Sequence, residues 1–426
     1  MLDLKFIREF PEHVAAGAAK KHFTCDIDRI LELDKELRSL GQEVDSIRSA
    51  QRQAGKAIAQ ASNEERPALL VQQKAEKEKL KVSEARQSEL QEEIDRLLLD
   101  VPNPPAPEVP EGKDDAENVE LSHFGEPTTF TFEPLSHIEI GERQGWLDIE
   151  RGARIAGSRN YILLGDLSLL EGAVMRYALD TMVDKGFTPI SVPTLVRSSV
   201  MVGTGYFPGG EDQAYRCDDR DDLVLVGTAE VPVTAYRQDE ILTLEELPLR
   251  YVALSSCYRR EAGAAGRDTK GLYRVHQFQK VEQVVIDRND EALSIENHHE
   301  ILGNSEGIMQ SLELPYRVVD VCGGDLGKPA IQKFDIETWM PSRENYGETH
   351  SASRFHEYQS RRLKLRYRDE DKKVRYCHTL NNTVAASTRM LIAIMENHQQ
   401  ADGTVRVPEP LKPYLRGREF LGKPIR

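Results

Sequence analysis

Apolar residues recur at alternating spacings of three and four between residues 30 and 58. This heptad seam contains Ile30, Leu33, Leu37, Leu40, Val44, Ile47, Ala54 and Ile58, with Gln51 as its polar interruption. Such a repeat places one apolar stripe along a long helix. After a polar turn at 61–67, a second run in the same register contains Leu69, Leu80, Leu90, Ile94, Leu97 and Val101. Pro67 falls in the first turn of this second helix, where proline is tolerated.

Two matched helices joined by a short polar turn predict an antiparallel coiled-coil helical arm over residues 27–100. At 1.5 Å per residue, about 32 residues in each helix give an arm of roughly 50 Å. The seam of the second helix is polar near the turn, at Gln73, Glu76, Ser83 and Gln87. We therefore expect a weakly packed tip that projects into solvent. A coiled coil that joins two chains, or a packed helical pair, would show the same repeat.

Prolines between 102 and 107 end the second helix, because proline lacks an amide donor and disfavours helical geometry in the residue before it. We expect an N-terminal domain at 1–101, a linker at 102–133 and a larger domain at 134–426. Beyond the linker, a helix near 168–185 should place Met175, Leu179, Met182 and Val183 on one face and stop at Gly186. An edge strand at 187–193 follows, since prolines are confined to edges or strand starts.

Strand-like runs dominate the larger domain, at 223–226, 251–260, 277–286, 317–321 and 362–367. Hairpin-like strands with a few helices between them indicate an α+β fold, an antiparallel sheet flanked by helices. The phosphate-binding pattern GxxxxGK[ST] does not occur in the sequence, which argues against a Walker-type nucleotide site.

Composition narrows the class of protein. A chain of 426 residues has room for two or three domains, and its net charge of −15 means that a nucleic-acid contact needs a local basic patch. The five cysteines form no CxxC pair, so neither a disulfide framework nor a four-ligand zinc site is expected. No apolar run reaches the length of a membrane span, and the first residues do not resemble a signal peptide. These features predict a cytoplasmic protein without membrane contact.

The strongest chemical signal is Tyr258-Arg259-Arg260-Glu261 at the end of a predicted strand. Alternate residues of a strand share a face, so Arg259 and Glu261 should point one way and Tyr258 and Arg260 the other. The fixed fork of arginine suits a phosphate, and a nearby carboxylate can accept from an adenine amino group or orient the arginine. An exposed cross-strand Arg–Glu pair would give the same pattern.

A glycine-rich basic loop follows, with Gly263, Gly266 and Gly271 around Arg267, Asp268 and Lys270. Such a loop between two strands suits closure over a polyanion, although a solvated hairpin loop would look similar.

The run RREAGAAGRDTKGLYRVHQFQKVE at 259–282 resembles the second signature motif of class II aminoacyl-tRNA synthetases, in the form found in bacterial-type seryl-tRNA synthetases. The resemblance extends over essentially the whole chain, including the helical hairpin, the stretch GTGYFP at 203–208 and the segment 396–414. It implies the class II catalytic fold, with ATP and Mg²⁺ and no zinc.

By this resemblance, ATP would be bound by Arg259 at its α-phosphate, by Glu261 at adenine, and by Arg389 at the γ-phosphate and the adenine face. Arg260, Val275, His276, Gln277 and Phe278 would line the same site. Arg389 falls in the first turn of a predicted helix at 387–397, where the helix dipole favours anions. Without the resemblance, Arg389 would be interpreted as a surface arginine paired within the protein.

The same resemblance implies the serine and magnesium sites. Serine would be bound by Thr228, Ala229, Glu230, Glu282, Asn381 and Thr383. Period two would put Thr228 and Glu230 on one face of a strand, although this triplet would also suit a strand end or a cap. The segment Glu348, Thr349, His350 and Ser351 would contact ATP, with Glu348 and Ser351 as oxygen ligands of Mg²⁺. By itself, Glu348 would be interpreted as a solvated carboxylate.

Some positions depart from the family pattern. Many relatives have Asn-Gly-Ser at 381–383 and glycines at 385 and 386, where this chain has Asn382, Thr383, Ala385 and Ala386. Others have a cysteine and an asparagine in place of Ala352 and Arg354. The oxygen-bearing side chains are retained, so the departures bear on the packing of the pocket.

The predicted function is ATP-dependent activation of L-serine to seryl-adenylate and transfer to the 3′ end of tRNA(Ser), with tRNA(Sec) as a further acceptor. The arm would contact tRNA through Arg48, Arg52, Lys56, Lys74, Lys77, Lys79 and Lys81. The helix ending at Gly186 and the strand after it would form a homodimer interface. Two alternatives are a paralogue that loads serine onto a non-tRNA acceptor and a non-enzymatic coiled-coil interaction protein.

Overall fold

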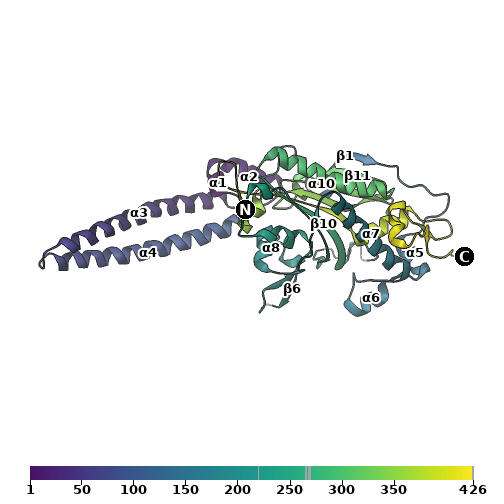
Figure 1. The fold of residues 1–426 in the computed structure, drawn as a ribbon, viewed down its shortest axis with the longest axis horizontal. Helices are drawn as coiled ribbons and strands as arrows, with labels where there is room; N and C mark the ends of the chain where they lie inside the picture. The colour runs from purple at the N-terminus through teal and green to yellow at the C-terminus, as the bar shows by residue number, and fades with distance from the viewer. Residues whose placement is uncertain (219, 264–265, 267–269, 425–426) are drawn as a thin grey trace. The chain divides into compact units, whose positions relative to one another are not determined.

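The computed structural model describes residues 1–218, 220–263, 266 and 270–424. They form two compact units, one of Met1–Ala19 and Phe23–Pro104 and one of Lys20–His22 and Pro105–Arg426 (Figure 1). Arg267 and Asp268 of the predicted basic loop lie outside the described residues. None of the helices in the described part of the chain combines the length and the apolar content that a membrane span requires.

The first unit contains the predicted helical arm. Helices α1 (Leu4–Glu9) and α2 (Pro11–Lys20) precede the two long helices α3 (Ile27–Gln60) and α4 (Arg66–Leu98). Figure 1 shows α3 and α4 as one long hairpin. Ion pairs between the helices join Arg29 to Glu93, Glu36 to Arg86 and Glu43 to Lys79, and their opposite progression confirms the antiparallel arrangement.

Packing in the arm is uneven along its length. At the base, Ile30 and Leu33 of α3 are buried with Leu90 and Ile94 of α4. Ile47 is the last buried residue of α3, so its final turns have little packing to hold them. The predicted polar seam explains this weakness, because burial of apolar surface stabilises such a pair most.

The second unit is built on a sheet of eight described strands in the order β1-β11-β12-β13-β16-β10-β9-β4. Their bounds are β1 Val119–Phe124, β11 Tyr316–Asp320, β12 Gln332–Met340, β13 Asn345–Arg354, β16 His378–Ala386, β10 Gln277–Asp287, β9 Leu249–Tyr258 and β4 Thr188–Pro189. All neighbouring pairs are antiparallel except β4 with β9. The predicted α+β class with an antiparallel sheet is therefore confirmed.

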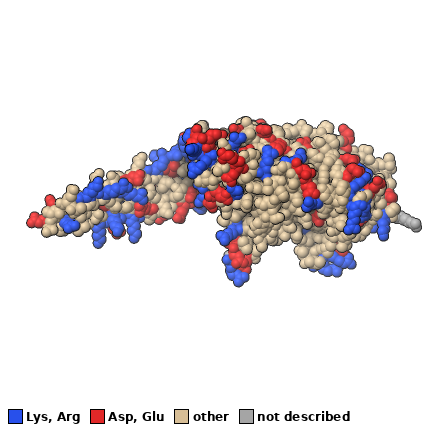
Figure 2. Space-filling view, viewed as in Figure 1, with Lys and Arg blue, Asp and Glu red and all other residues tan. Residues whose placement is uncertain are grey.

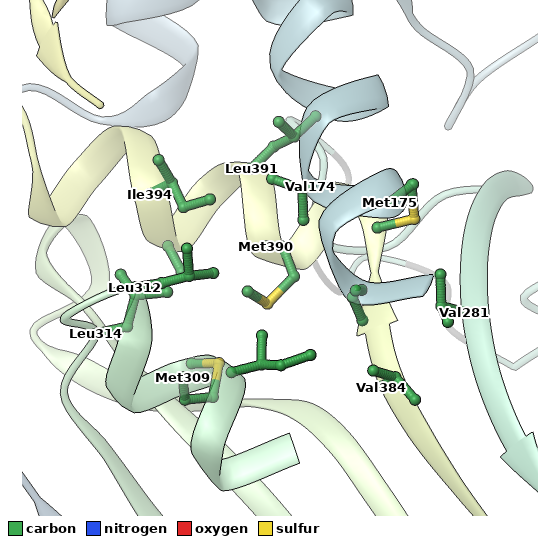
Figure 3. Close-up of a cluster of buried hydrophobic side chains, with 14 of the residues drawn as sticks. Val174, Met175, Val281, Met309, Leu312, Leu314, Val384, Met390, Leu391 and Ile394 are labelled. Carbon is green, nitrogen blue, oxygen red and sulfur yellow. The ribbon is translucent and has the colours of Figure 1, made fainter. Parts of the chain in front are cut away.

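One face of this sheet carries the main hydrophobic core. Helices α7 (Gly165–Asp184), α10 (Glu291–Ser311) and α12 (Ser387–Asn397) pack against it. Figure 3 shows Met175 of α7 and Met390 of α12 near Val281 and Val384 of the sheet. Because side chains alternate along a strand, the residues between these apolar positions point to the opposite face.

The other described elements surround this layer. The helices are α5 (His137–Gln144), α6 (Ile149–Ala156), α8 (Ser198–Thr204), α9 (Glu230–Thr234) and α11 (Tyr358–Leu363). Small sheets are formed by β2 (Leu147–Asp148) with β3 (Ile162–Leu163), by β5 (Leu195–Arg197) with β7 (Leu223–Leu225) and β6 (Tyr215–Asp218), by β15 (Val374–Tyr376) with β14 (Arg366–Arg368) and β8 (Ile241–Leu242), and by β17 (Val405–Arg406) with β18 (Phe420–Leu421).

Three local predictions were wrong. The expected strand at 362–367 begins in helix α11, where the Arg362 guanidinium donates to the carbonyl oxygens of Val202 and Phe207. The expected strand at 187–193 is reduced to Thr188–Pro189 at the sheet edge. Val183 of α7 is 41% exposed and does not join the apolar face. The division into domains stays a prediction; within its linker segment 102–133 the structure forms the edge strand β1.

Candidate active site

The face of the sheet opposite the core is lined with polar side chains. Phe278, Lys280 and Glu282 alternate along β10 and point to this face, while Val281 between Lys280 and Glu282 points to the core. Glu282 lies directly opposite Thr383 of β16. Residues opposed across a ladder share a face, so Thr383 joins the same polar surface.

Two irregularities in the ladders extend this surface. The pairing shifts at Val384, between the pairs Val281–Ala385 and Glu282–Thr383. It shifts again at Thr349, between the pairs Ile336–His350 and Glu337–Glu348. A bulge adds one residue to one strand and changes the alternation beyond it. As a result Glu348 and Ser351, although three residues apart, lie opposite Glu337 and Asp335, which share a face.

Two adjoining cavities lie over the polar face, and they share Arg259, Glu261, Arg274, Glu348 and Arg389. The first is also lined by Tyr273, Val275, Phe278, Lys280, Thr349, Thr383, Ala386 and Thr388. The second is also lined by Met201, Tyr206, Gly210, Gln213, Ala214, Leu225, Gly227, Tyr258 and Ala262. Residues more than 180 positions apart in the sequence thus surround one space.

Two arginines reach this space from different elements. Arg259 follows β9, and its guanidinium carbon lies 5.3 Å from the centre of the Phe278 ring. Arg389 lies in the first turn of α12, as predicted, and its guanidinium lies 4.8 Å from the centre of the Tyr273 ring. Guanidinium groups stacked on aromatic rings keep their forks available for an anion.

Glu348 carries a negative charge beside Arg389. An Arg389 Nη donates to the Glu348 carbonyl oxygen at 2.6 Å and lies 3.4 Å from its carboxylate. Partial removal from bulk water would raise the pKa of Glu348, but Arg389, then Lys333 and Arg259, lower it to about 2. Glu348 is therefore ionised at neutral pH, and its side chain remains 47% exposed.

Arg259 and Glu261 do not lie on the strand that the sequence pattern predicts. Strand β9 ends at Tyr258, and Glu261 adopts a left-handed backbone with φ of 52°. Glu261 still lines the cavity with Arg259 because the turn redirects it, and its carboxylate accepts from Arg274 at 3.0 Å. Arg260 is exposed, and its guanidinium lies 5.7 Å from the centre of the Tyr215 ring. It lines neither cavity of the described residues.

The segment 275–278 contributes in two ways. Val275 and Phe278 line the cavity. His276 Nδ1 instead lies 2.9 Å from the carbonyl oxygen of Arg259, and its ring contacts Tyr215. The backbone oxygen of Gln277 accepts from the Tyr161 hydroxyl at 3.2 Å. His276 and Gln277 therefore shape the backbone around the cavity.

The triplet Thr228-Ala229-Glu230 does not form a strand. It lies at the start of α9, where the Thr228 hydroxyl accepts from the Glu230 amide at 3.2 Å. The expected period-two face was wrong, because the triplet leads from a turn into a helix whose N-cap residue is Ala229. All three residues are buried.

Glu230 is held by neutral groups. Its carboxylate accepts from the Tyr206 hydroxyl at 2.9 Å and from the Gln359 amide at 2.7 Å. Burial, and next the charge of Glu282, raise the pKa of Glu230 to about 7. This carboxyl therefore changes its charge near neutral pH.

Glu282 has a cationic partner on the same strand. The Lys280 ammonium lies 2.5 Å from the Glu282 carboxylate and 3.4 Å from the Thr383 hydroxyl. Burial raises the pKa of Glu282, and Lys280 acts in the opposite direction. Asn381 lies two residues before Thr383, opposite Ser353 and Val284, and is buried.

Thr349 and His350 both make hydrogen bonds to the backbone of neighbouring strands. The Thr349 hydroxyl donates to the carbonyl oxygen of Ile336 at 3.1 Å, and His350 Nε2 lies 3.1 Å from the carbonyl oxygen of Val384. Burial lowers the pKa of His350 to about 4, so its imidazole is neutral at pH 7. Thr349 also lines the first cavity.

Most departures from the family pattern lie behind the site. The Asn382 amide donates to the Ser305 hydroxyl of α10 at 2.8 Å. Ala352 lies opposite Asn382, and Ala385 belongs to the main core. Of the departures at 382, 385, 386 and 352, Ala386 lines the cavity. These substitutions therefore mainly repack the contact between the sheet and its helices.

Sequence reasoning missed several residues of the site. Tyr206 could have been found, because it belongs to the GTGYFP stretch that carried the resemblance. Lys280 also stands inside the quoted motif, between Phe278 and Glu282. Tyr273 lies in the same motif, before Arg274. Gln359 gave no sequence signal, because its contact with Glu230 joins elements far apart in the sequence.

Comparison with known proteins identifies two matching regions. Residues 1–105 match the model of the seryl-tRNA synthetase N-terminal domain. Residues 215–398 match the class II tRNA synthetase core domain of the enzymes for glycine, histidine, proline, serine and threonine. The two matches cover the arm and every residue that lines the first cavity.

Full-length relatives are similar over the whole chain. A serine–tRNA ligase of Deinococcus radiodurans is 49% identical over 426 residues, which covers 100% of both chains. The solved seryl-tRNA synthetase of Pyrococcus horikoshii, complexed with ATP, is 39% identical with a TM-score of 0.94 over 100% of both chains. The serine–tRNA ligase of Naegleria fowleri, in complex with AMP, is 32% identical with a TM-score of 0.89 over 99% of each.

Proposed function

This chain belongs to the seryl-tRNA synthetases, and we propose how its described residues divide the reaction of that family. The enzyme activates L-serine with ATP to form seryl-adenylate and then transfers the seryl group to the 3′ end of tRNA(Ser). One observation carries the proposal: the cavities lined by Arg259 and Arg389 are also lined by Lys280 and Tyr206, which contact the acids Glu282 and Glu230. It offers cations for a triphosphate and carboxylates for an amino acid.

The first step needs positioned charge. The serine carboxylate is ionised at neutral pH and attacks the ATP α-phosphate, and pyrophosphate leaves. Arg259 contacts the α-phosphate, and Arg389 contacts the γ-phosphate, so that both stabilise the charge of the transition state. The adenine lies between Phe278 and Arg389, and the Glu261 carboxylate accepts a hydrogen bond from its amino group. Neither a protein nucleophile nor a general base is required.

The serine side combines charge with a hydroxyl site. Glu230 binds the substrate ammonium, and Glu282 with Thr383 binds the substrate hydroxyl. Thr228, Ala229 and Asn381 complete the walls. Such a site strongly rejects analogues without the hydroxyl, because its own polar groups would be left unpaired.

Mg²⁺ fits the oxygen groups on β13. Glu348 is ionised and exposed to the cavity, and the bulge at Thr349 brings Ser351 to the same face. Among the residues that the structure describes, no cluster of three His, Cys, Asp or Glu side chains could hold a metal. A magnesium ion held by Glu348 and Ser351 would therefore share its shell with ATP phosphates and water, and it would neutralise phosphate charge.

The arm supplies the contact with tRNA. Figure 2 shows Lys and Arg side chains along α3 and α4. The seven predicted bases are all exposed. Arg48 pairs with Glu84 and Lys79 with Glu43, whereas the described residues provide no ion-pair partner for Arg52, Lys56, Lys74, Lys77 or Lys81. Unpaired cations on a projecting surface suit phosphate contacts.

Further features follow from family membership. Edge strand β4 and the exposed Val183 and Leu169 of α7 support a homodimer interface on this side of the second unit. Acceptance of tRNA(Sec) rests on the resemblance alone, and a cytoplasmic location rests on the sequence features given above. No observation favours a non-tRNA acceptor, and the complete arm argues against it.

Amino-acid-dependent exchange of pyrophosphate into ATP tests the assignment of serine. Exchange should depend on serine, with alanine and glycine disfavoured by roughly 10⁴-fold because they lack the hydroxyl. Threonine should be excluded by the size of the pocket. Equal exchange with serine and alanine would refute the substrate assignment.

The pKa of Glu230 predicts a pH effect on serine binding. Below pH 7 the carboxyl is protonated and cannot pair with the substrate ammonium. The KM for serine should therefore fall by about tenfold as pH rises from 6 to 8. The KM for ATP should not follow this curve. A Glu230→Gln variant should have a high KM for serine without the midpoint near pH 7, and a midpoint retained in this variant would contradict the assignment.

A further inference from the structure

Lys280 is a buried cation inside the amino-acid site. It is 6% exposed on β10, two residues before Glu282 and opposite Ser255 of β9. Its ammonium contacts both the Glu282 carboxylate, at 2.5 Å, and the Thr383 hydroxyl, at 3.4 Å. Lys280 therefore touches both groups that the proposed function assigns to the serine hydroxyl.

The charges of the site require this cation. Glu230 and Glu282 are both buried, and the side-chain partners of Glu230 are the neutral Tyr206 and Gln359. A buried charge without a counter-ion is strongly unfavourable. Lys280 offsets the charge of Glu282, and Glu230 remains to pair with the ammonium of the substrate. Without Lys280, one of the two acids would retain a proton.

We propose that Lys280 is a positioning residue of the serine site: it holds Glu282 as a charged hydrogen-bond acceptor beside Thr383 and leaves Glu230 free to pair with the substrate ammonium. The inference rests on the proposed function. Lys280 acts through Glu282 and Glu230 and takes no part in bond making. It thereby sets the charge state in which the pocket binds serine.

The ionisable groups around Lys280 come from several elements. Lys280 interacts electrostatically with Cys257 of β9, Glu282 of β10, Glu230 of α9 and His350 of β13. Arg259, which follows β9, and Tyr206, which follows α8, interact with the two acids. Burial raises the pKa of the Cys257 thiol and that of the Tyr206 hydroxyl, and it lowers the pKa of His350. Glu230, whose pKa is raised to about 7, is therefore the group near Lys280 that the pH curve reports.

The test measures the KM for serine against pH in pyrophosphate exchange. In Lys280→Met, the KM for serine at pH 7 should rise roughly 100-fold, as for one partner removed from a buried charge pair, while the KM for ATP stays unchanged. The midpoint of the pH curve should move above that of the wild type, because both acids lose the ammonium. Lys280→Arg should keep the wild-type midpoint. Lys280→Gln repeats the neutral substitution if the Met variant does not fold.

A charge-balanced double variant separates positioning from packing. Lys280→Met with Glu282→Gln removes one cation and one anion, so the midpoint should return toward the wild-type value while the KM remains high. A wild-type midpoint in both Lys280→Met and Lys280→Gln, with folding verified by thermal unfolding, would overturn the inference. Absence of serine-dependent exchange in the wild type would instead refute the proposed function.

Discussion

Replacing Arg259 with alanine should lower kcat/KM for serine-dependent pyrophosphate exchange by about 10³-fold. The guanidinium lies over the Phe278 ring at one boundary of both cavities. The proposed function assigns the α-phosphate to this cation, so its removal leaves the transition-state charge without its main partner. Steady-state exchange with saturating Mg²⁺ measures the effect.

The adjacent arginine provides a matched control. Arg260 has the same charge and the same sequence context, but its guanidinium lies over Tyr215 outside the cavity linings. Arg260→Ala should therefore change kcat/KM by less than about fivefold, the size of an exposed cation–π contact. Equal losses in the two variants would show that general basicity, and not the position of Arg259, supports the reaction.

Shortening the arm should separate the two steps of the reaction. Gly41 and Gln87 face each other across the hairpin, because a Cβ at Gly41 would lie 3.6 Å from the Gln87 amide nitrogen. Replacing residues 43–85 with a glycine-rich turn retains the basal core of Leu33, Leu90 and Ile94. Exchange should remain at the wild-type level, whereas charging of tRNA should fall by about 10³-fold, the lower range of specific over non-specific nucleic-acid binding.

Charge variants of the full-length arm control for the shortened fold. Neutral substitutions at Lys74, Lys77 and Lys81 should raise the KM for tRNA and lower its dependence on salt by about one unit of slope for each lost phosphate contact. Serine-dependent exchange should not change. If arm deletion reduced exchange and charging equally, the arm would serve the stability of the enzyme and not tRNA binding.

The arm could be predicted from the sequence because its information is local. Spacings of three and four persist through α3, and Pro67 marks the start of the next helix. The weak tip was also visible, because polar residues such as Gln73 and Glu76 interrupt the seam. Long helices with regular seams need no knowledge of distant partners.

The geometry of the site could be predicted only where the strands stay regular. Lys280 and Glu282 share a face by simple alternation, but Glu348 and Ser351 share one because of the bulge at Thr349. Glu261 reaches the cavity through a left-handed turn, which a period-two argument cannot anticipate. The resemblance named these residues as candidates, while the strand reasoning placed Glu261 on the wrong element.

The contacts that the sequence did not reveal join residues far apart in the chain, and the pairing of the strands brings these residues together. The contact of Lys280 with Thr383 joins residues 103 positions apart and depends on the pairing of β10 with β16. The contact of Gln359 with Glu230 joins residues 129 positions apart. Asn382 looked like a change in the pocket, yet the same register turns it toward Ser305 on the opposite face. Only assembly of the sheet decides these contacts.

Charging of total tRNA with labelled amino acids tests the central claim most directly. The account predicts that the purified protein, with ATP and Mg²⁺, attaches labelled serine to a small subset of tRNAs. Labelled threonine, alanine and glycine should give no stable product above the level without enzyme. Transfer of another amino acid, or formation of seryl-adenylate without any serine on tRNA, would contradict the account.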